Sequence, residues 1–298
     1  MPMKLSQIYE PIQDDLIVAK KRLIDDVKKL AGRYVDGPGR NGGKSLASTK
    51  VSPTRLAIDA IAHLFGSSGK SLRPALLLLS AGASNPSGYR RKRATEAAAG
   101  MVELIHSASL IHDDVIDESN HRRSIVSVHG KFGVKVAILA GDILFSHGFE
   151  VLTNLEETPD SIKIELLGIF SDLTKQMCYG EIAEQQVIEG TESVDDYLEI
   201  VELKTARLFS VSCKVGAILA DGNGSATEAA EQFGLNFGYA YQLADDKADN
   251  DSVYRGKTDF TERSNAYMKS AREALCELEP SPFRNSLDEL CSFVAPSS

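Results

Sequence analysis

The stretch ELIHSASLIHDDVIDESNHRR, residues 103–123, decides the fold because it joins a helical pattern of apolar residues to three carboxylates. At about 100° per helical residue, Asp113, Asp114 and Asp117 lie at about 0°, 100° and 40°, so they share one helix face. Like charges this close repel one another unless solvent or a cation screens them. Taken alone, the stretch fits a solvated acidic face as well as a cation site.

The same spacing recurs in YQLADDKAD at 241–249. Asp245, Asp246 and Asp249 repeat the i, i+1, i+4 pattern, and Gln242 lies within the same arc. Apolar residues surround both motifs, and burying an unpaired carboxylate is costly. Two facing carboxylate clusters would hold hard cations, and Mg²⁺ is commonly bound through one or two carboxylates plus substrate phosphates. The pair of motifs therefore predicts a magnesium site that acts on a phosphorylated ligand.

The rest of the chain predicts helices and almost no strand. Apolar residues from Leu5 to Tyr34 recur at helical spacing, with acidic residues early and basic residues late. Further helical segments are predicted near 53–66, 71–84, 90–112, 130–154, 159–189, 194–221, 225–250, 264–279 and 284–294. Long helices joined by short turns are typical of helix bundles. We therefore expect an all-α chain in one domain, residues 1–298, with a flexible Gly- and Ser-rich loop at 36–50.

Composition excludes several classes of protein. With 43% hydrophobic and 25% charged residues the chain is typical of a soluble globular protein, neither collagen-like nor disordered. A formal net charge of −9 argues against non-specific nucleic-acid binding, which requires a basic surface. No apolar run reaches the roughly 18 residues of a membrane span, and the first residues carry no targeting signal. We expect a cytoplasmic protein with no integral membrane segment, and its four cysteines, which form no CxxC pair, as reduced thiols.

Basic and polar residues occur where a phosphate ligand would need them. They are Lys70 and Arg73 in GKSLRP, His106, Arg122, Arg123, and Lys204 with its neighbour Thr205. Each also has an ordinary structural explanation, such as a surface pair, a core histidine or a solvated helix residue. Their order around the two aspartate motifs favours a binding site for an anionic ligand.

With these motifs in this order, the sequence resembles the trans-type isoprenyl diphosphate synthases, or polyprenyl synthetases. The matching stretches are GKSLRP (69–74), ELIHSASLIHDDVIDESNHRR (103–123), VAILAGDILF (136–145), LKTARLF (203–209) and GYAYQLADDKAD (238–249). The resemblance implies a bundle of long helices around a deep central cavity, usually a homodimer. It also implies that the two aspartate motifs face each other across the mouth of that cavity.

The resemblance assigns roles to the residues that match. The implied Mg²⁺ ligands, which grip the diphosphate of an allylic substrate, are Asp113, Asp114, Asp117, Asp245, Asp246 and Asp249. The implied direct contacts to that diphosphate are Arg122, Lys204, Thr205 and Gln242, with Lys257 as a further substrate contact. The implied isopentenyl diphosphate site is made of Lys70, Arg73, His106 and Arg123.

The reaction that the resemblance implies is a head-to-tail condensation. Metal ions and cationic side chains stabilise the departing diphosphate, so that the allylic carbon becomes a cation. The double bond of isopentenyl diphosphate attacks this cation, and loss of a proton completes elongation by one five-carbon unit. No nucleophilic Ser or Cys is needed, which agrees with the lack of a triad-like signature.

Product length, by the same resemblance, depends on what blocks the cavity below the first motif. Bulky aromatic residues four or five positions before the first Asp stop growth early, and these positions are Ser109 and Ala108 here. Ile105, further along the same helix, is also modest in size. We therefore expect a geranylgeranyl or longer product, with Phe145 and Phe149 as candidates to close the cavity deeper down.

The sequence departs from the family pattern after Asp249. Residues 250–298 read as a shortened C-terminal tail that lacks a loop and at least one helix. A pocket less shielded from water would lose its carbocation to hydrolysis, so a noncatalytic or weakly active regulatory subunit of a heteromeric synthase is an alternative. The complete aspartate motifs favour the enzyme. A class I terpene cyclase is disfavoured, because the second motif is DDxxD and the basic residues indicate a second diphosphate substrate.

Overall fold

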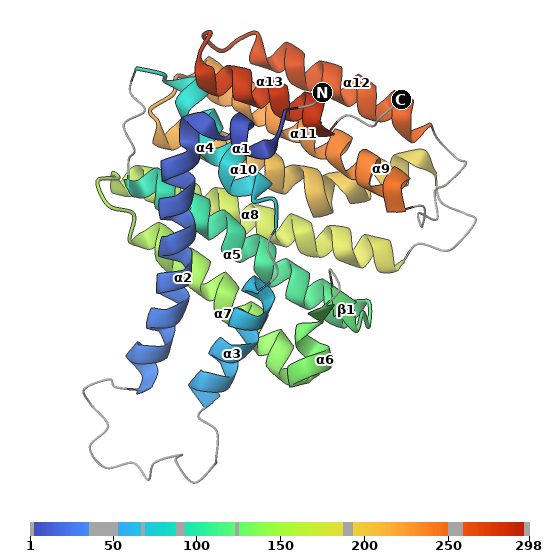
Figure 1. Ribbon diagram of the computed structural model, residues 1–298. Coiled ribbons are helices and arrows are strands. Elements are labelled where there is room, and N and C mark those ends of the chain that lie inside the picture. The colour runs from blue at the N-terminus through green and yellow to red at the C-terminus, as the bar shows by residue number, and fades with distance from the viewer. Residues whose placement is uncertain are drawn as a thin grey trace.

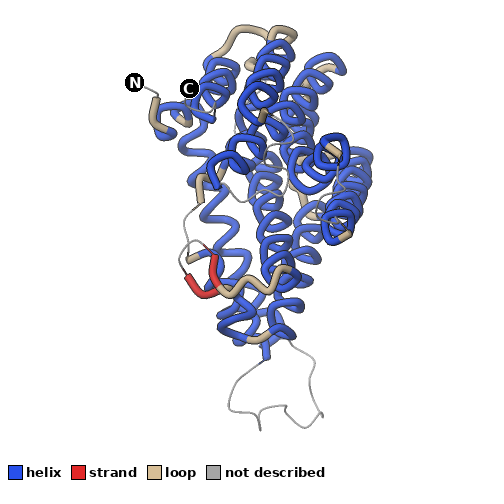
Figure 2. The backbone as a smooth tube through the Cα atoms, turned by 90° about the vertical axis from the view of Figure 1, so that its right-hand side faces the viewer, coloured by secondary structure: helices blue, strands red, loops and turns tan. Residues whose placement is uncertain are grey.

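The computed structural model describes residues 3–35, 53–66, 69–87, 93–122, 125–186, 193–249 and 259–294. The predicted loop at 36–50 and the predicted site residues Arg123 and Lys257 lie outside these ranges, and for Asp249 the backbone alone is described. The described chain is an elongated bundle of helices with one short hairpin (Figures 1 and 2). The predicted all-α fold is confirmed.

The helices follow the predicted order closely. They are α1 (Leu5–Ile8), the 3₁₀ turn η1 (Glu10–Ile12), α2 (Gln13–Val35), α3 (Pro53–Phe65), α4 (Leu72–Ser84), α5 (Arg93–Ile116), α6 (Val128–Phe132), α7 (Val134–Thr153), α8 (Asp160–Gln185), α9 (Val194–Val201), the π-helical turn η2 (Glu202–Ala206), α10 (Arg207–Leu219), α11 (Gly224–Asp249), α12 (Phe260–Leu275) and α13 (Pro282–Val294). Helices α12 and α13 lie beside each other at the end of the bundle where α1 and α4 also lie (Figure 1).

Three predicted helices are divided in the structure. The segment predicted at 130–154 is α6 followed by α7, because Gly133 between them has a φ of 87°, a conformation that L residues rarely adopt. The segment predicted at 194–221 is α9, η2 and α10. The first helix is interrupted at η1, which contains Pro11, a residue with no N–H to continue an α-helical ladder.

A two-stranded hairpin follows α5. Strand β1 (His121–Arg122) pairs antiparallel with β2 (Ile125–Val126), in a register that places Arg122 opposite Ile125. Two-residue strands are too short to leave a pattern of alternating hydrophobicity in the sequence. The hairpin matters for the site because it fixes Arg122 beside the end of α5.

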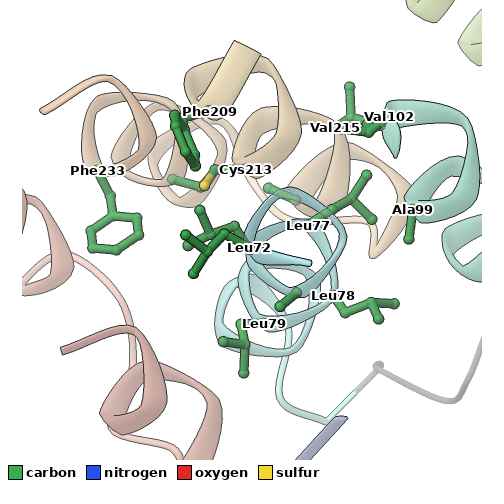
Figure 3. Close-up of a cluster of buried hydrophobic side chains, with 14 of the residues drawn as sticks. Leu72, Leu77, Leu78, Leu79, Ala99, Val102, Phe209, Cys213, Val215 and Phe233 are labelled. Atoms are coloured by element: carbon green, nitrogen blue, oxygen red, sulfur yellow. The ribbon is translucent and has the colours of Figure 1, made fainter. Parts of the chain in front are cut away.

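Helix α4 lies in the centre of the core. Its four consecutive leucines, Leu76–Leu79, are fully buried, and Figure 3 shows Leu77 on the side of α4 that faces Val215 of α10, with Leu78 and Leu79 on other sides of the helix. Helix α10 approaches closely at Gly216, where a Cβ atom would lie 2.1 Å from the carbonyl oxygen of Leu77. This tight packing fixes the start of α4 and, with it, the residues of the GKSLRP motif.

Helix α7 is the one helix of the described ranges that is long and apolar enough to cross a membrane by length and composition. It packs against α3, α5, α6 and α8, as the core helix of a bundle does. Its outer face exposes Val134, Ile138 and Leu139, the last with 60% of its surface accessible. The four cysteines are free thiols, as predicted.

Candidate active site

The first aspartate motif lies at the C-terminal end of α5, and its three carboxylates have different surroundings. Asp113 is half-buried and Asp117 is exposed, whereas Asp114 is only 2% exposed. The Nε atom of Arg122 donates a hydrogen bond of 2.7 Å to Oδ1 of Asp114. Among the described residues, the buried Oδ2 atom of Asp114 has no hydrogen-bond partner. Asp114, a predicted Mg²⁺ ligand, thus forms an ion pair with Arg122, a predicted contact of the diphosphate.

Nearby positive charge offsets the burial of Asp113 and Asp117 only in part. Burial raises the pKa of Asp113 to about 7, and Glu181 raises it further, although Lys204 and Arg122 oppose the shift. Partial desolvation and Glu181 also raise the pKa of Asp117. A carboxyl group whose pKa lies near neutrality is poorly stabilised in its charged form. A divalent cation at this end of α5 would provide the missing charge.

Lys204 and Thr205 lie on the π-helical turn η2, which is packed between α8 and α11. Glycines allow this close approach on both sides. A Cβ atom at Gly180 of α8 would lie 2.9 Å from Cγ of Lys204, and one at Gly238 of α11 would lie 2.6 Å from Cα of Ala206. Single π-helical turns within helices are often found at functional sites. Here the turn places two consecutive polar side chains between the two aspartate motifs.

The ammonium group of Lys204 is held by two carboxylates of α8. Its Nζ atom lies 2.6 Å from Oε2 of Glu181 and also pairs with Oε2 of Glu184. Burial alone would lower the pKa of Lys204, but the ion pairs with Glu181 and Glu184 outweigh burial and raise it. Lys204 therefore carries its full charge close to Asp113.

The second aspartate motif lies on the last turns of α11. Thr205 Oγ1 donates to Oε1 of Gln242 at 3.0 Å, and Gln242 Nε2 donates to Oδ1 of Asp246 at 2.9 Å. The hydroxyl of Tyr197 on α9 donates to the other carboxylate oxygen of Asp246. Asp245 is exposed. These hydrogen bonds link α9, η2 and α11, and they fix Asp246 while Asp245 faces outward.

Of the predicted isopentenyl diphosphate residues, Lys70 and Arg73 lie at the start of α4 and His106 lies on α5, whereas Arg123 is outside the described ranges. Nη1 of Arg73 lies 3.0 Å from Nε2 of His106, which must accept because a guanidinium is only a donor. The same guanidinium stacks over the ring of Phe209, 4.5 Å from its centroid. The carbonyl of Lys70 accepts a 3.1 Å hydrogen bond from the hydroxyl of Tyr9. The structure thus brings Arg73 and His106 together and ties the Lys70 backbone to the N-terminal part of the chain.

The predicted chain-length residues do not all lie on the same side of α5. Ser109 is one turn before Asp113 and half-buried, and its Oγ donates to the carbonyl of His106 at 2.9 Å. Ala108 is fully buried in a cluster with residues of α3 and α7, on the side of α5 that faces away from Asp113. Ile105 is also fully buried, and its Cγ1 lies 3.5 Å from where a Cβ of Gly148 would be. Ser109 is therefore the position closest to the face that carries the first motif.

Sequence reasoning missed three residues that contact the site: Glu181, Glu184 and Tyr197. The two glutamates follow Gly180 in GEIAE, three positions apart, which brings them to one helix face. That spacing is common on solvated helices, so it carries little information without knowledge of how α8 packs on η2. Tyr197 carried no signal, because its role depends on the position of α9 beside the end of α11.

The arrangement fits a divalent cation that is shared with a ligand. Within the ranges that the structure describes, no three His, Cys, Asp or Glu side chains converge on a point that a metal ion could occupy. Mg²⁺ does not need such a cage, because it usually binds through one or two carboxylates together with substrate phosphates. The oxygen donors of Asp113 and Asp117, whose pKa values burial raises despite Lys204 and Arg122, suit such an ion.

Comparison with known sequences identifies a family. The family model described as Polyprenyl synthetase matches residues 55–265. The geranylgeranyl diphosphate synthase of Sulfolobus acidocaldarius is 37% identical over 190 residues, which cover 63% of this chain and 56% of that protein. Solanesyl diphosphate synthase 2, chloroplastic, of Arabidopsis thaliana is 32% identical over 251 residues, which cover 83% of this chain and 53% of that protein. The chain spans about half the length of these curated relatives.

Solved structures share the fold. The decaprenyl diphosphate synthase of Rhodobacter capsulatus superposes with a TM-score of 0.80 at 21% identity, over 98% of both chains. A polyprenyl synthase of Caulobacter crescentus, complexed with calcium and isoprenyl diphosphate, gives a TM-score of 0.78 at 22% identity, over 100% of this chain and 99% of that one. The family match covers well over half of the chain and includes both aspartate motifs. The chain belongs to the polyprenyl synthetase family.

Proposed function

We propose that the chain is a trans-prenyltransferase that condenses isopentenyl diphosphate with an allylic diphosphate, assisted by Mg²⁺, to give a geranylgeranyl or longer polyprenyl diphosphate. One observation carries this proposal. The turn η2 carries a residue linked to each aspartate motif. The positive charge of Lys204 opposes the burial that raises the pKa of Asp113, and Thr205 is connected to Asp246 by hydrogen bonds through Gln242. An allylic diphosphate placed between the motifs would meet carboxylates, an ammonium group and amide donors together.

Each group of residues has a part in this reaction. Asp113 and Asp117, with Asp245 opposite, would hold Mg²⁺, which when bound neutralises the diphosphate and makes it a better leaving group. Lys204 and Gln242 donate to the diphosphate and stabilise the charge that develops as the carbon–oxygen bond breaks. Arg73, His106 and Lys70 bind the second diphosphate and orient its double bond toward the allylic cation. The departing pyrophosphate takes the proton that is lost.

The solved structure of the Caulobacter crescentus polyprenyl synthase supports the choice of ligands. That protein is complexed with a divalent hard cation and an isoprenyl diphosphate. The curated relatives are named for geranylgeranyl and solanesyl products, which are long chains. A small residue at Ser109 agrees with a product of at least geranylgeranyl length.

The test is a direct assay of the purified chain. It is incubated with Mg²⁺, labelled isopentenyl diphosphate and, in separate reactions, dimethylallyl, geranyl or farnesyl diphosphate, and the products are sized by chromatography. A ladder that ends at one length supports the proposal and identifies the product. Absence of product from all three primers, with the protein folded, would contradict it and indicate a noncatalytic subunit of a heteromeric synthase.

Ser109→Phe is expected to shorten the product by at least one five-carbon unit. Ser109 lies one turn below Asp113 on the same side of α5, so a phenyl ring there would occupy the path of a growing chain. Product sizing with farnesyl diphosphate as primer checks this. Ala108→Phe is the matched control, because Ala108 is packed against α3 and α7 and a larger side chain there should lower the melting temperature instead. Unchanged product length in Ser109→Phe would place the floor of the cavity elsewhere.

We further propose that the chain acts in the cytoplasm as a homodimer whose interface includes the outer face of α7. Three apolar side chains, Val134, Ile138 and Leu139, are exposed on this helix, and a subunit interface would cover them. Leu139→Glu is expected to convert the dimer to a monomer, as measured by light scattering after size-exclusion chromatography. Ile17→Glu, at an exposed position on α2, is the control and should leave the mass unchanged. A monomeric wild-type protein, or a dimer that survives Leu139→Glu, would contradict this interface.

A further inference from the structure

Glu181 and Glu184 of α8 hold a side chain that the proposed reaction needs. The two carboxylates lie one helical turn apart and approach the ammonium of Lys204 together, Glu181 at 2.6 Å. The side chains of Glu181 and Lys204 are 10% and 21% exposed, so this pair is shielded from water more than an ordinary surface ion pair. Breaking a shielded pair is costly, because it leaves a charge away from water without a partner. Lys204 is therefore held in one position while both glutamates are present.

The first aspartate motif offers other carboxylates to Lys204. Burial raises the pKa of Asp113 and Asp117, and the positive charge of Lys204 opposes this rise. Within the described part of the chain, however, the ion pairs of Lys204 are made with Glu181 and Glu184. A lysine has four rotatable bonds, and without the two glutamates it would be able to turn toward Asp113. There it would occupy the place that a cation needs.

We propose that Glu181 and Glu184 are positioning residues, which hold the ammonium of Lys204 where it meets the allylic diphosphate and keep it away from Asp113. This inference rests on the proposed function of the site. It also accounts for Gly180, because the absence of a Cβ there lets η2 lie against α8 closely enough for the contact. Both glutamates act through Lys204 and do not themselves touch the reacting atoms.

Binding of Mn²⁺ in the presence of saturating inorganic pyrophosphate tests the inference without any turnover. Free Mn²⁺ is measured by electron paramagnetic resonance for the wild type and for Glu181→Gln with Glu184→Gln. Glutamine keeps the shape of the side chain and its bond with Gln185, but it removes the charge that holds Lys204. We expect Mn²⁺ to bind about tenfold more weakly in the double variant, as is usual when a residue that orients a metal site is replaced.

A double-mutant cycle with Lys204→Met distinguishes positioning from a simple loss of negative charge. If the glutamates act through Lys204, their replacement in the Lys204→Met background should change Mn²⁺ binding by less than about twofold. Equal weakening in both backgrounds would overturn the inference, because the carboxylates would then act by charge alone. Unchanged binding in the wild-type background would also overturn it.

The single variant Glu184→Gln serves if the double variant fails to fold, since 46% of the Glu184 side chain is exposed. In the prenyl assay it should raise the Mg²⁺ concentration for half-maximal rate and the KM for the allylic diphosphate, and leave the KM for isopentenyl diphosphate unchanged. Glu231→Gln, which breaks the ion pair with Lys214 elsewhere in the fold, is the matched control and should change none of these. If the wild type makes no prenyl product, the proposed function fails while the Mn²⁺ cycle still decides the role of Glu181 and Glu184.

Discussion

Asp113→Ala and Asp245→Ala are each expected to lower turnover at least about a thousandfold, which corresponds to a loss of about 4 kcal/mol of transition-state stabilisation. Each variant removes one of the carboxylates that would hold Mg²⁺ against the departing diphosphate. Neither is expected to unfold the protein. Asp113 lies at the C-terminal end of α5, where a negative charge is unfavourable to the helix dipole, and Asp245 is exposed. The helical circular-dichroism signal should therefore be that of the wild type.

Asp172→Ala provides the matched control for this pair. Asp172 is a solvent-exposed carboxylate of α8 that pairs with Lys175, so its removal should leave turnover within about twofold of the wild type. Initial rates with saturating Mg²⁺ and both substrates decide the outcome. Near-normal turnover in both Asp113→Ala and Asp245→Ala would remove the basis for a cation held between the two motifs. A loss in one variant alone would assign the cation to that motif.

The helices could be predicted from sequence because most of them carry long apolar patterns. The predicted segment 71–84 corresponds to α4 within one residue at its start, because its leucines leave no alternative to a buried helix. The breaks were harder to predict. The positive φ of Gly133 and the π-helical turn at Glu202–Ala206 arise from local packing, and neither changes the hydrophobic periodicity on which the prediction rests.

The candidate site was predictable where it depends on residue type and spacing, and unpredictable where it depends on packing. Periodicity treats Asp113, Asp114 and Asp117 as equals on one face. The hairpin that follows α5 buries Asp114 with Arg122 and so separates it from the other two. Likewise, Glu181 becomes part of the site only because α8 lies against η2. The proximity of Arg73 to His106, in contrast, agrees with the common role that the resemblance implies for them.

Asp113→Asn is expected to raise the melting temperature of the metal-free protein at pH 8 by at least about 2 °C. Burial raises the pKa of Asp113 from an ordinary value of 3.8 to about 7, so the folded state disfavours the charged form. The linkage between pKa and folding sets an upper limit of about 4 kcal/mol on this cost, and the partial exposure of the side chain reduces it. The neutral asparagine has no such cost.

The effect of Asp113→Asn on stability should depend on pH. For a carboxyl group whose pKa is raised by folding, the contribution to the free energy of unfolding is favourable below the ordinary pKa of 3.8 and is lost as the pH rises through about 7. The advantage of Asp113→Asn over the wild type should therefore be largest at pH 8 and should shrink as the pH is lowered toward 5. Melting curves in a chelator at several pH values measure it. A less stable variant at pH 8 would show that Asp113 has a favourable partner when charged.

Asp246→Asn provides the opposite control. Asp246 accepts hydrogen bonds from Gln242 and Tyr197, so replacing one carboxylate oxygen by an amide should lower the melting temperature at the same pH. The contrast separates two kinds of aspartate that the sequence motifs do not distinguish. The carboxylate of Asp246 is stabilised by hydrogen bonds within the fold, whereas the charged form of Asp113 is destabilised by burial. A carboxylate that destabilises the fold at a candidate site is the pattern expected of a residue that serves function. Mg²⁺ with pyrophosphate should therefore raise the melting temperature of the wild type more than that of Asp113→Asn.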